Sequence, residues 1–336
     1  MKVYIYGGGN GSRLYPFSQY NSKMLLRIFG TSIVEIQLHM LETAGLDKVG
    51  ILFSKNNTKE LDTIRNKFPK LHIELLKIIP EHTYAWGAIR ESNNDDEILI
   101  VNSDIIFSKD WLTEIVGTGR KSDATFVACN SKSIGEGQEG QVVWYTYDTD
   151  ENIKNYTLVY TPNHHMANEI GISKIKTKIL ESINITKFSE YQDFWYDYFV
   201  PQILSKYKAK VLTSKSHWRD VGTWDRYHKI HMDILEKKIV GVEYLLDDFI
   251  VFKNRVAIHK SSINNNAKYK KNCVVFKNAS IGPNTTISNS IIGNNVVIGE
   301  NCVINDSVIL DNGNLNSNLT INGKIIDGCK QYDKRN

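Results

Sequence analysis

The 336-residue sequence predicts an α/β protein: a mixed, mostly parallel sheet flanked by helices, followed by a small parallel β-helix. Two observations lead to this fold class. Over about the first 240 residues, short apolar runs alternate with amphipathic stretches, as in sheets whose parallel strands are joined by helices. From residue 264 onward, asparagine becomes dense and β-branched residues recur at short intervals. We therefore expect two domains, residues 1–240 and residues 241–336.

The first domain is expected to begin with the strand "VYIY", followed by a helix in "SIVEIQLHMLETAG" that ends near Gly45. Further on, "KVGILFS" and "HIELLKII" are separated by the amphipathic "KELDTIRNKF". The run "EILIVNSDIIF" is apolar on both sides of its centre, as in a strand that is buried on both faces. Ligands of such sheets bind at the carboxyl ends of strands. The segments "GGGNG" and "NSD" both follow strands, so we expect them to share one crevice.

The second domain carries a repeat whose near copies read "IGPNTTI", "IGNNVVI" and "IGENCVI". Each copy places two isoleucines six residues apart, and a six-residue period is typical of a parallel β-helix, whose coils bury their apolar edges by stacking. Glycine and asparagine suit the tight turns between the short strands. A low-complexity tail, the alternative, would not keep isoleucine in register. The repeat becomes irregular after Ile309, so only a few coils are expected.

The composition is that of an ordinary globular protein, with 41% hydrophobic and 23% charged residues. The 41 basic and 37 acidic side chains are too evenly spread to indicate a nucleic-acid or membrane partner. No stretch approaches the ~18 apolar residues of a membrane helix, and the N-terminus lacks a secretion signal. Four widely spaced cysteines suit structural thiols in a reducing compartment: Cys129, Cys273, Cys302 and Cys329. We expect a cytoplasmic protein.

The glycine-rich segment after the first strand is the first candidate site. A strand that enters such a turn lets backbone N–H groups approach phosphate oxygens closely. Arg13 then offers a guanidinium fork, and Lys23 offers a compact positive charge. The spacing matches neither a Walker motif nor a convincing dinucleotide fingerprint. The cluster suits a reaction in which negative charge builds on a polyphosphate. For Lys23 alone, the alternative is a solvated surface lysine.

Two aspartates form the second candidate site. Asp104 follows an apolar strand, where an unpaired carboxylate would be costly, so it is either a turn cap or a metal ligand. Asp220 precedes a Gly-Thr turn in which Thr223 is expected to cap the next helix. Two carboxylates in one crevice, completed by substrate phosphates, are what Mg²⁺ prefers. For Asp220, the alternative is an ion pair with Arg219 or Arg226.

In this order, the motifs resemble those of the sugar-1-phosphate nucleotidyltransferases, or nucleotide-sugar pyrophosphorylases. The family signature G-G-x-G-[TS]-R-L-x-P and its later lysine read here "GGNGSRLYPFSQYNSK". The family's N-G-D, D-x-x-x-P-x-L and W-x-D-[VT]-G-T read "NSD", "DYFVPQIL" and "WRDVGT". A hexapeptide-repeat tail often accompanies them. The resemblance covers nearly the whole chain, and it implies a Rossmann-like catalytic domain over residues 1–240 and a left-handed β-helix over residues 241–336.

The resemblance also implies a reaction. A sugar 1-phosphate would attack the α-phosphorus of a nucleoside triphosphate, release pyrophosphate and form a nucleoside-diphosphate sugar. Arg13 would bind the leaving pyrophosphate, and Lys23 would contact the phosphates near the α-position. The residues implied for the other roles are Gly8, Gly9, Gly11, Ser12 and Asn102 for the nucleotide, Asn168 and Glu169 for the sugar phosphate, and Asp104 and Asp220 for Mg²⁺.

The residues expected to bind the sugar phosphate, and the segment expected to bind the nucleobase, depart from the family pattern. The usual E-K-P falls near Leu158 and Val159, which supply neither the carboxylate nor the ammonium. Glu169 replaces a small residue, and "TYAWGA" is bulkier than the usual turn and has no preceding Gln to read the base. His164 and His165 either replace the lost cation or are merely exposed.

Two functions stay open. The first is an active nucleotidyltransferase, for which the Pro–Lys spacing favours thymidylyl over guanylyl transfer only weakly. The second is a catalytically degenerate subunit that binds nucleotide sugars and regulates an active partner. Acyl transfer by the tail would need a histidine base, but the last histidine, His259, precedes the clear repeats. We expect the tail to mediate homo-oligomer formation.

Overall fold

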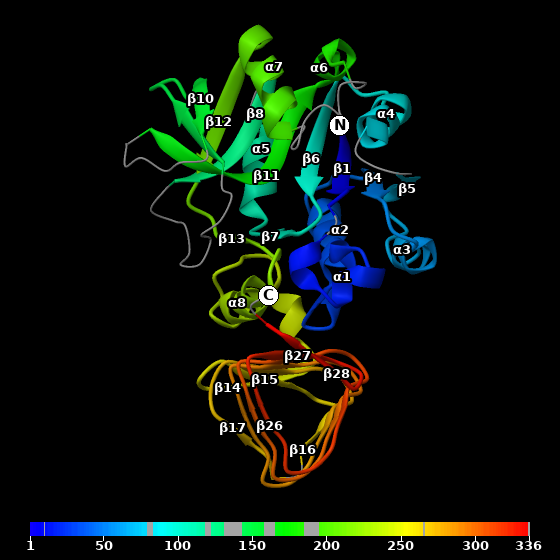
Figure 1. The fold of residues 1–336 in the computed structure, drawn as a ribbon. Coiled ribbons are helices and arrows are strands. Elements are labelled where there is room, and N and C mark those ends of the chain that lie inside the picture. Colours follow the sequence, from blue (N-terminus) through cyan, green and yellow to red (C-terminus); the bar gives the residue numbers. More distant parts are fainter. Residues whose placement is uncertain are drawn as a thin grey trace. The chain divides into compact units, whose positions relative to one another are not determined.

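The computed structural model describes residues 1–9, 11–78, 83–117, 122–130, 143–157, 165–184, 195–264 and 266–334 (Figure 1). Contacts within the chain divide it into two compact units. The first unit comprises Met1–Asn10, Asn21–Met24 and Val34–Asp220, and the second comprises Gly11–Tyr20, Leu25–Ile33 and Val221–Asn336. The N-terminal segment therefore contributes to both units. The domain boundary near residue 240 stays a prediction.

The first unit is built on a mixed nine-stranded sheet. Its parallel part has the order β5 (His72–Lys77), β4 (Lys48–Phe53), β1 (Lys2–Gly7) and β6 (Glu97–Asn102). Antiparallel pairing begins where β11 (Met166–Lys176) joins β6, and the remaining strands are β9 (Trp144–Tyr147), β10 (Ile153–Thr157), β8 (Ala124–Asn130) and β12 (Ala209–Ser214). The predicted α/β fold with a mixed sheet is confirmed.

Helices accompany this sheet as the alternating pattern predicts (Figure 1). They are α2 (Ile33–Thr43), α3 (Thr58–Arg65), α4 (Thr83–Ser92), α5 (Asp110–Gly117), α6 (Thr177–Ser182) and α7 (Val200–Lys206), with a π-helical turn at Trp195–Phe199. The helix expected to end near Gly45 does so, because Gly45 has a φ of +73°. Among the described residues, no helix is long and apolar enough to cross a membrane.

In the second unit, N-terminal segments pack against α8 (Trp224–Leu235). These segments are the 3₁₀ turns Ser12–Leu14 and, in part, Lys23–Leu25, the helix α1 (Phe17–Tyr20), and the hairpin of β2 (Arg27–Ile28) and β3 (Thr31–Ser32). Trp224 Nε1 donates to the Tyr15 carbonyl at 2.9 Å, and the Tyr227 hydroxyl donates to the Arg27 carbonyl at 2.9 Å. Thr223 caps α8, as predicted, by accepting a hydrogen bond from the Arg226 amide.

The repeat region forms coils of three short strands each, and in Figure 1 these coils have a triangular outline. A 3₁₀ turn at Glu243–Leu246 precedes it. The first face has the order β14 (Phe249–Phe252), β15 (Val256–His259), β18 (Cys273–Val275), β21 (Ile291–Ile292), β24 (Val308–Ile309), β27 (Lys324–Asp327) and β28 (Lys330–Asp333). The second comprises β16 (Ile263–Asn264), β19 (Ser280–Ile281), β22 (Val297–Ile298) and β25 (Asn314–Leu315). The third comprises β17 (Lys268–Tyr269), β20 (Thr286–Ser288), β23 (Val303–Asn305) and β26 (Thr320–Asn322).

Each complete coil advances the chain by 17 residues, because Ile281 pairs with Ile298 and Ile287 pairs with Ile304. The predicted isoleucine ladder is confirmed as the buried interior, and it continues beyond Ile309, where the sequence pattern becomes irregular. Its members are Ile281, Ile287, Ile292, Ile298, Ile304, Ile309, Leu315, Ile321 and Ile326. The last steps are not recognisable in the sequence, because Leu315 replaces isoleucine and the residues around it differ from the repeat.

Asparagine is abundant in the repeats because it occupies the corners. Asn278, Asn295 and Asn312 all have φ between 55° and 63°, a left-handed conformation that asparagine tolerates better than most residues. Their side chains also form a ladder, in which each amide donates to the amide one coil later at 3.3 and 3.2 Å. Asparagine therefore suits the corners for two reasons: it adopts the left-handed backbone conformation, and its side chain forms hydrogen bonds between coils.

We predict that Ile304→Ala lowers the free energy of unfolding by about 2–5 kcal/mol, because the side chain is fully buried between coils. Urea denaturation followed by circular dichroism measures this change. The control is Val303→Ala at the neighbouring, 47% exposed position, for which we expect a change within about 0.5 kcal/mol. Equal losses in the two variants would contradict the assignment of the interior.

A buried histidine on α8 contacts the N-terminal hairpin of the second unit. His231 is fully buried; its Nε2 accepts from the Phe29 amide at 3.4 Å, and its Nδ1 donates to the Tyr227 carbonyl at 2.8 Å. Burial lowers the pKa of His231 from 6.5 to about 3. Burial also lowers the pKa of the nearby His228. Both side chains are therefore neutral in the folded protein near pH 7.

This neutrality predicts a loss of stability in acid. Below pH 6.5 the unfolded chain binds a proton at His231 that the folded chain does not bind, so stability falls as the pH falls from 6.5 toward 3. We expect His231 to contribute a loss of about 2 kcal/mol between pH 6.5 and pH 5. Unfolding free energies of the wild type and His231→Gln over this range test the idea. The variant should show the shallower dependence on pH, and equal slopes would refute it.

Candidate functional site

The two predicted metal ligands are brought together by a small antiparallel sheet in the first unit. After β6, a turn containing Asp104 leads into β7 (Ile105–Phe107), which pairs with β13 (Trp218–Asp220). In this register Asp220 lies opposite Ile105, the residue that follows Asp104. Asp104, in the turn before β7, and Asp220, at the end of β13, are more than 100 positions apart in the sequence, and the pairing of these strands brings their backbones close together.

Lys23 is held against one of these carboxylates. Its Nζ donates to Asp104 Oδ2 at 2.7 Å, and the two side chains are only 16% and 24% exposed. The preceding residue fixes the segment, because the buried Ser22 amide donates to Asn57 Oδ1 at 3.0 Å. The alternative of a solvated surface lysine is therefore wrong for Lys23. Asp104 lies in a turn and forms an ion pair, and it retains a second carboxylate oxygen.

The start of the glycine-rich loop lies beside Lys23. A Cβ at Gly7 would lie 2.1 Å from Met24 Cε and 2.6 Å from the Leu52 carbonyl oxygen, so only glycine fits there. Gly8 is half-buried, and a Cβ at the exposed Gly9 would lie 3.7 Å from Lys23 Nζ. Backbone at Gly9 and the lysine ammonium thus line the same edge, beyond the end of β1.

The rest of the loop belongs to the second unit. Gly11 has a φ of +66°, and its carbonyl accepts a hydrogen bond from the Leu14 amide at 2.8 Å, which starts a 3₁₀ turn. Leu14 is buried, whereas Ser12 and Arg13 are exposed. The buried Leu14 side chain therefore fixes the turn, and the Ser12 hydroxyl and the Arg13 guanidinium are exposed to a ligand.

Gln37 on α2 positions the turn that carries Asp104. Its Nε2 donates to the carbonyls of Asn102 and Ile105 at 2.8 and 2.9 Å, and the side chain is 1% exposed. The Asn102 side chain packs on Gly171, whose φ is +82° and where a Cβ would lie 2.4 Å from Asn102 Nδ2. The sequence motifs do not point to Gln37. A lone amide on the apolar face of the helix is the signal that points to it.

Lys55 is a second cation that the sequence motifs do not reveal. It follows β4, the parallel neighbour of β1, and so lies at the same edge of the sheet as the glycine-rich loop. Partial burial, and then the charge of Lys23, lower the pKa of Lys55. This electrostatic coupling indicates that the edge is electropositive, as a triphosphate site requires.

The two residues implied for the sugar phosphate lie on β11. Asn168 is 1% exposed, and its amide nitrogen and oxygen have no hydrogen-bond partner among the residues that the structure describes. Glu169 is 8% exposed and accepts a hydrogen bond from the Tyr145 hydroxyl at 2.8 Å, which stabilises a carboxylate where the family has a small residue. Buried amides normally have partners, so Asn168 fits a residue that awaits a ligand.

The other departures are partly explained by packing. Trp86 of "TYAWGA" stacks on Phe199 with ring centres 4.5 Å apart and on Trp195 at 5.5 Å, so its bulk fills the core. The His165 ring lies edge-to-face on Tyr147, with centres 5.7 Å apart. Leu158, Val159 and His164 lie outside the described residues.

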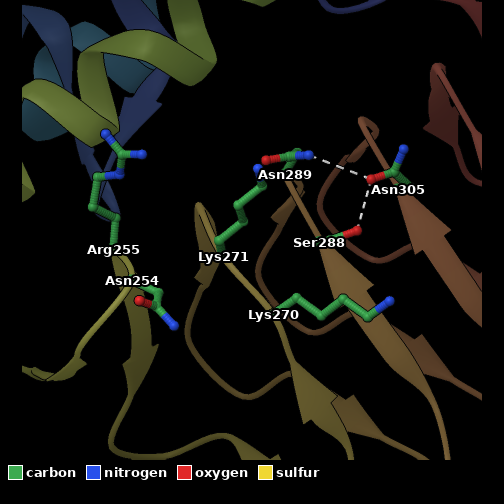
Figure 2. Close-up of a pocket in the computed structure, with 7 residues that line it drawn as sticks. All are labelled: Asn254, Arg255, Lys270, Lys271, Ser288, Asn289 and Asn305. Carbon is green, nitrogen blue, oxygen red and sulfur yellow. Dashed lines mark hydrogen bonds between the residues drawn. The ribbon is translucent and has the colours of Figure 1, made fainter.

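A separate cavity of about 480 Å³ lies among the corners of the repeat region, and Figure 2 shows the residues that line it. They are Asn254, Arg255, Lys270, Lys271, Ser288, Asn289 and Asn305. Asn305 Oδ1 accepts from Ser288 Oγ at 2.6 Å and from Asn289 Nδ2 at 3.4 Å. None of the predicted site residues lines this cavity, and its cations are solvent-exposed.

Comparison with known proteins agrees with this arrangement. Residues 2–237 match the nucleotidyl transferase family, which is most of the chain. The chain belongs to this family. Residues 272–313 match the bacterial transferase hexapeptide (six repeats), in agreement with the β-helix. The resemblance to nucleotidyltransferases with hexapeptide repeats is thereby confirmed.

Relatives in this family share modest identity with the chain. It is 27% identical over 267 residues to the bifunctional protein GlmU of Methanocaldococcus jannaschii, which covers 78% of this chain and 61% of that protein. It is 22% identical over 271 residues to the glucose-1-phosphate adenylyltransferase of Clostridium novyi, which covers 71% of this chain and 68% of that protein. The match therefore spans about three fifths to two thirds of these relatives.

We predict that Gln37→Leu lowers the free energy of unfolding by about 1–3 kcal/mol, because two buried carbonyls lose their donor. Urea titration measures the loss. Gln19→Leu, at an exposed position of α1, serves as the control and should stay within about 0.5 kcal/mol of the wild type. A neutral Gln37→Leu variant would show that the turn does not depend on this amide.

Proposed function

We propose that the protein transfers a nucleoside monophosphate from a nucleoside triphosphate to a sugar 1-phosphate, or to a similar phosphorylated acceptor. Pyrophosphate is released and a nucleoside-diphosphate sugar is formed. The observation that carries this proposal is the Lys23–Asp104 pair beside the glycine-rich loop, with Asp220 on the adjoining strand pair, in a chain of the nucleotidyl transferase family.

In the proposed reaction, an acceptor phosphate oxygen attacks the α-phosphorus in line while the bond to the β-phosphate oxygen breaks. The electron pair of that bond leaves with pyrophosphate. Lys23 stabilises the charge that develops at the α-phosphate, and Arg13 binds the leaving pyrophosphate. The backbone of Gly8, Gly9, Gly11 and Ser12 and the side chain of Asn102 bind the nucleotide. These groups accelerate the reaction by positioning and by charge stabilisation.

The residues fit Mg²⁺ as the metal ion. Asp104 and Asp220 provide the oxygen ligands that this ion prefers. Mg²⁺ would neutralise phosphate charge when bound. Asp104 holds the Lys23 ammonium at 2.7 Å, so a phosphate that enters the site competes with the carboxylate for this ammonium.

The acceptor is proposed to bind at β11. Asn168 supplies an amide whose donor and acceptor both lack partners among the described residues, and Glu169, the next residue of the strand, supplies a buried carboxylate. The spacing of Pro16 and Lys23 favours thymine over guanine as the proposed nucleobase. We further propose that residues 241–336 mediate homo-oligomer formation.

A pyrophosphate-release assay tests the function. Four nucleoside triphosphates are each paired with a panel of sugar 1-phosphates, with Mg²⁺ or with EDTA. We expect Mg²⁺-dependent release from at least one pair. Nucleotide-sugar binding without turnover on any pair would instead support the second candidate, a regulatory subunit, which the altered residues at positions 158 and 159 favour.

Variants assign the roles in the same assay. Lys23→Ala should reduce kcat by about 10²- to 10³-fold, as for the loss of other preorganised charge donors. Asp104→Asn and Asp220→Asn should remove Mg²⁺-dependent turnover while circular dichroism shows an intact fold. Lys59→Ala, at an exposed position of α3, is the matched control and should leave kcat unchanged. An unaltered kcat in Lys23→Ala would remove this lysine from the mechanism.

A further inference from the structure

Strand β14 forms an open edge of the β-helix. It is the terminal strand of the seven-stranded face, where it pairs with β15, and no other described strand pairs with it. Its residues Ile250, Val251 and Phe252 are 50%, 48% and 51% exposed. Natural edge strands are usually protected by charges, proline or bulges. The sequence "FIVF" contains none of these protections.

The backbone of β14 presents hydrogen-bonding groups at this edge. The Lys260 amide donates to the Asp248 carbonyl at 2.9 Å, which fixes the hydrogen-bonding pattern of the β14–β15 pair. Hydrogen-bonded positions alternate along antiparallel strands, so Ile250 and Phe252 direct their N–H and C=O groups toward β15. Phe249 and Val251 therefore direct theirs toward the open edge.

The side chains of β14 extend the interior of the β-helix. Ile250 lies opposite Ile258 and Phe252 lies opposite Val256, and both of these partners belong to the buried core of the coils. Cross-strand neighbours share a face of the sheet. Ile250 and Phe252 thus continue the apolar core past its first coil, where the structure leaves them half exposed.

Charges at the two ends of β14 make it complementary to itself. Asp247 and Asp248 precede the strand, and Lys253 follows it. A twofold axis places two copies of a strand antiparallel, with the acidic end of one beside the basic end of the other. The outward-facing backbone groups match when the axis passes at Ile250, where Phe249 of one copy lies opposite Val251 of the other. In this register the turn that carries Asp247 and Asp248 in one copy precedes the end of the strand that lies beside Lys253 of the other copy.

We propose that two copies of this chain associate through antiparallel pairing of β14 with β14 about a twofold axis. The pairing joins the two seven-stranded faces into one continuous sheet and the two apolar interiors into one core. The occupant of the edge is a second copy because the strand carries both the acidic and the basic partner of the contact. This inference rests on the proposed role of residues 241–336 in homo-oligomer formation and names the strand that forms the contact; it involves none of the proposed catalytic residues.

Sedimentation velocity of the full chain, over a range of concentrations, tests the proposal. The wild type should be dimeric. Val251→Pro removes one outward N–H while leaving the hydrogen bonds to β15, since proline is tolerated where the N–H faces away from the sheet. This variant should be monomeric at concentrations where the wild type is dimeric. Val297→Lys, on the paired strand β22 and 48% exposed, is the control that should stay dimeric.

A charge exchange separates a specific contact from a folding defect. Asp247→Lys and Lys253→Asp should each raise the dimer dissociation constant about tenfold, a change equivalent to 1.4 kcal/mol. The double variant should return it to near the wild-type value, because the two exchanged charges again face opposite charges on the second copy. A monomeric wild type, or a dimer that all these changes leave intact, would overturn the proposal. Pyrophosphate release measured in parallel distinguishes a failure of assembly from a failure of the catalytic proposal.

Discussion

The ion pair between Lys23 and Asp104 is the interaction on which the candidate site depends. It joins the segment after the glycine-rich loop to the turn after β6, two stretches that are 81 residues apart. Partial burial strengthens the interaction relative to a surface pair, and removing one partner would leave the other charge poorly solvated. The pair therefore holds the ammonium at the edge of the sheet where a phosphate is expected to bind.

The support for this pair comes from residues without any chemical role of their own. Asn57 fixes the backbone beside Lys23, and Gln37 fixes both sides of the turn beside Asp104. Met24 fills the space that only a glycine at position 7 leaves open. The reactive groups thus have defined positions because buried amides and close packing satisfy the backbone around them.

The β-helix follows a simpler physical rule. Isoleucine fills the interior at each step, and asparagine takes the left-handed corners and bonds to its counterpart one coil away. Each coil buries its apolar edge only against its neighbours. A terminal coil therefore needs a cap or a partner to cover its apolar edge. Strand β14 lies at this edge, where it exposes apolar side chains and is flanked by charges of opposite sign.

The sequence by itself determined the order of strands and helices, the isoleucine ladder and the identity of Arg13, Lys23, Asp104 and Asp220 as candidates. These features depend on local periodicity and on short motifs, so they can be read from neighbouring residues. Only the tertiary structure placed Asp220 beside the Asp104 turn, showed that Gln37 and Lys55 belong to the same edge, and left the Asn168 amide without a described partner. The physical reason is that hydrogen bonds, burial and charge coupling act between residues far apart in the sequence, and no local pattern records them.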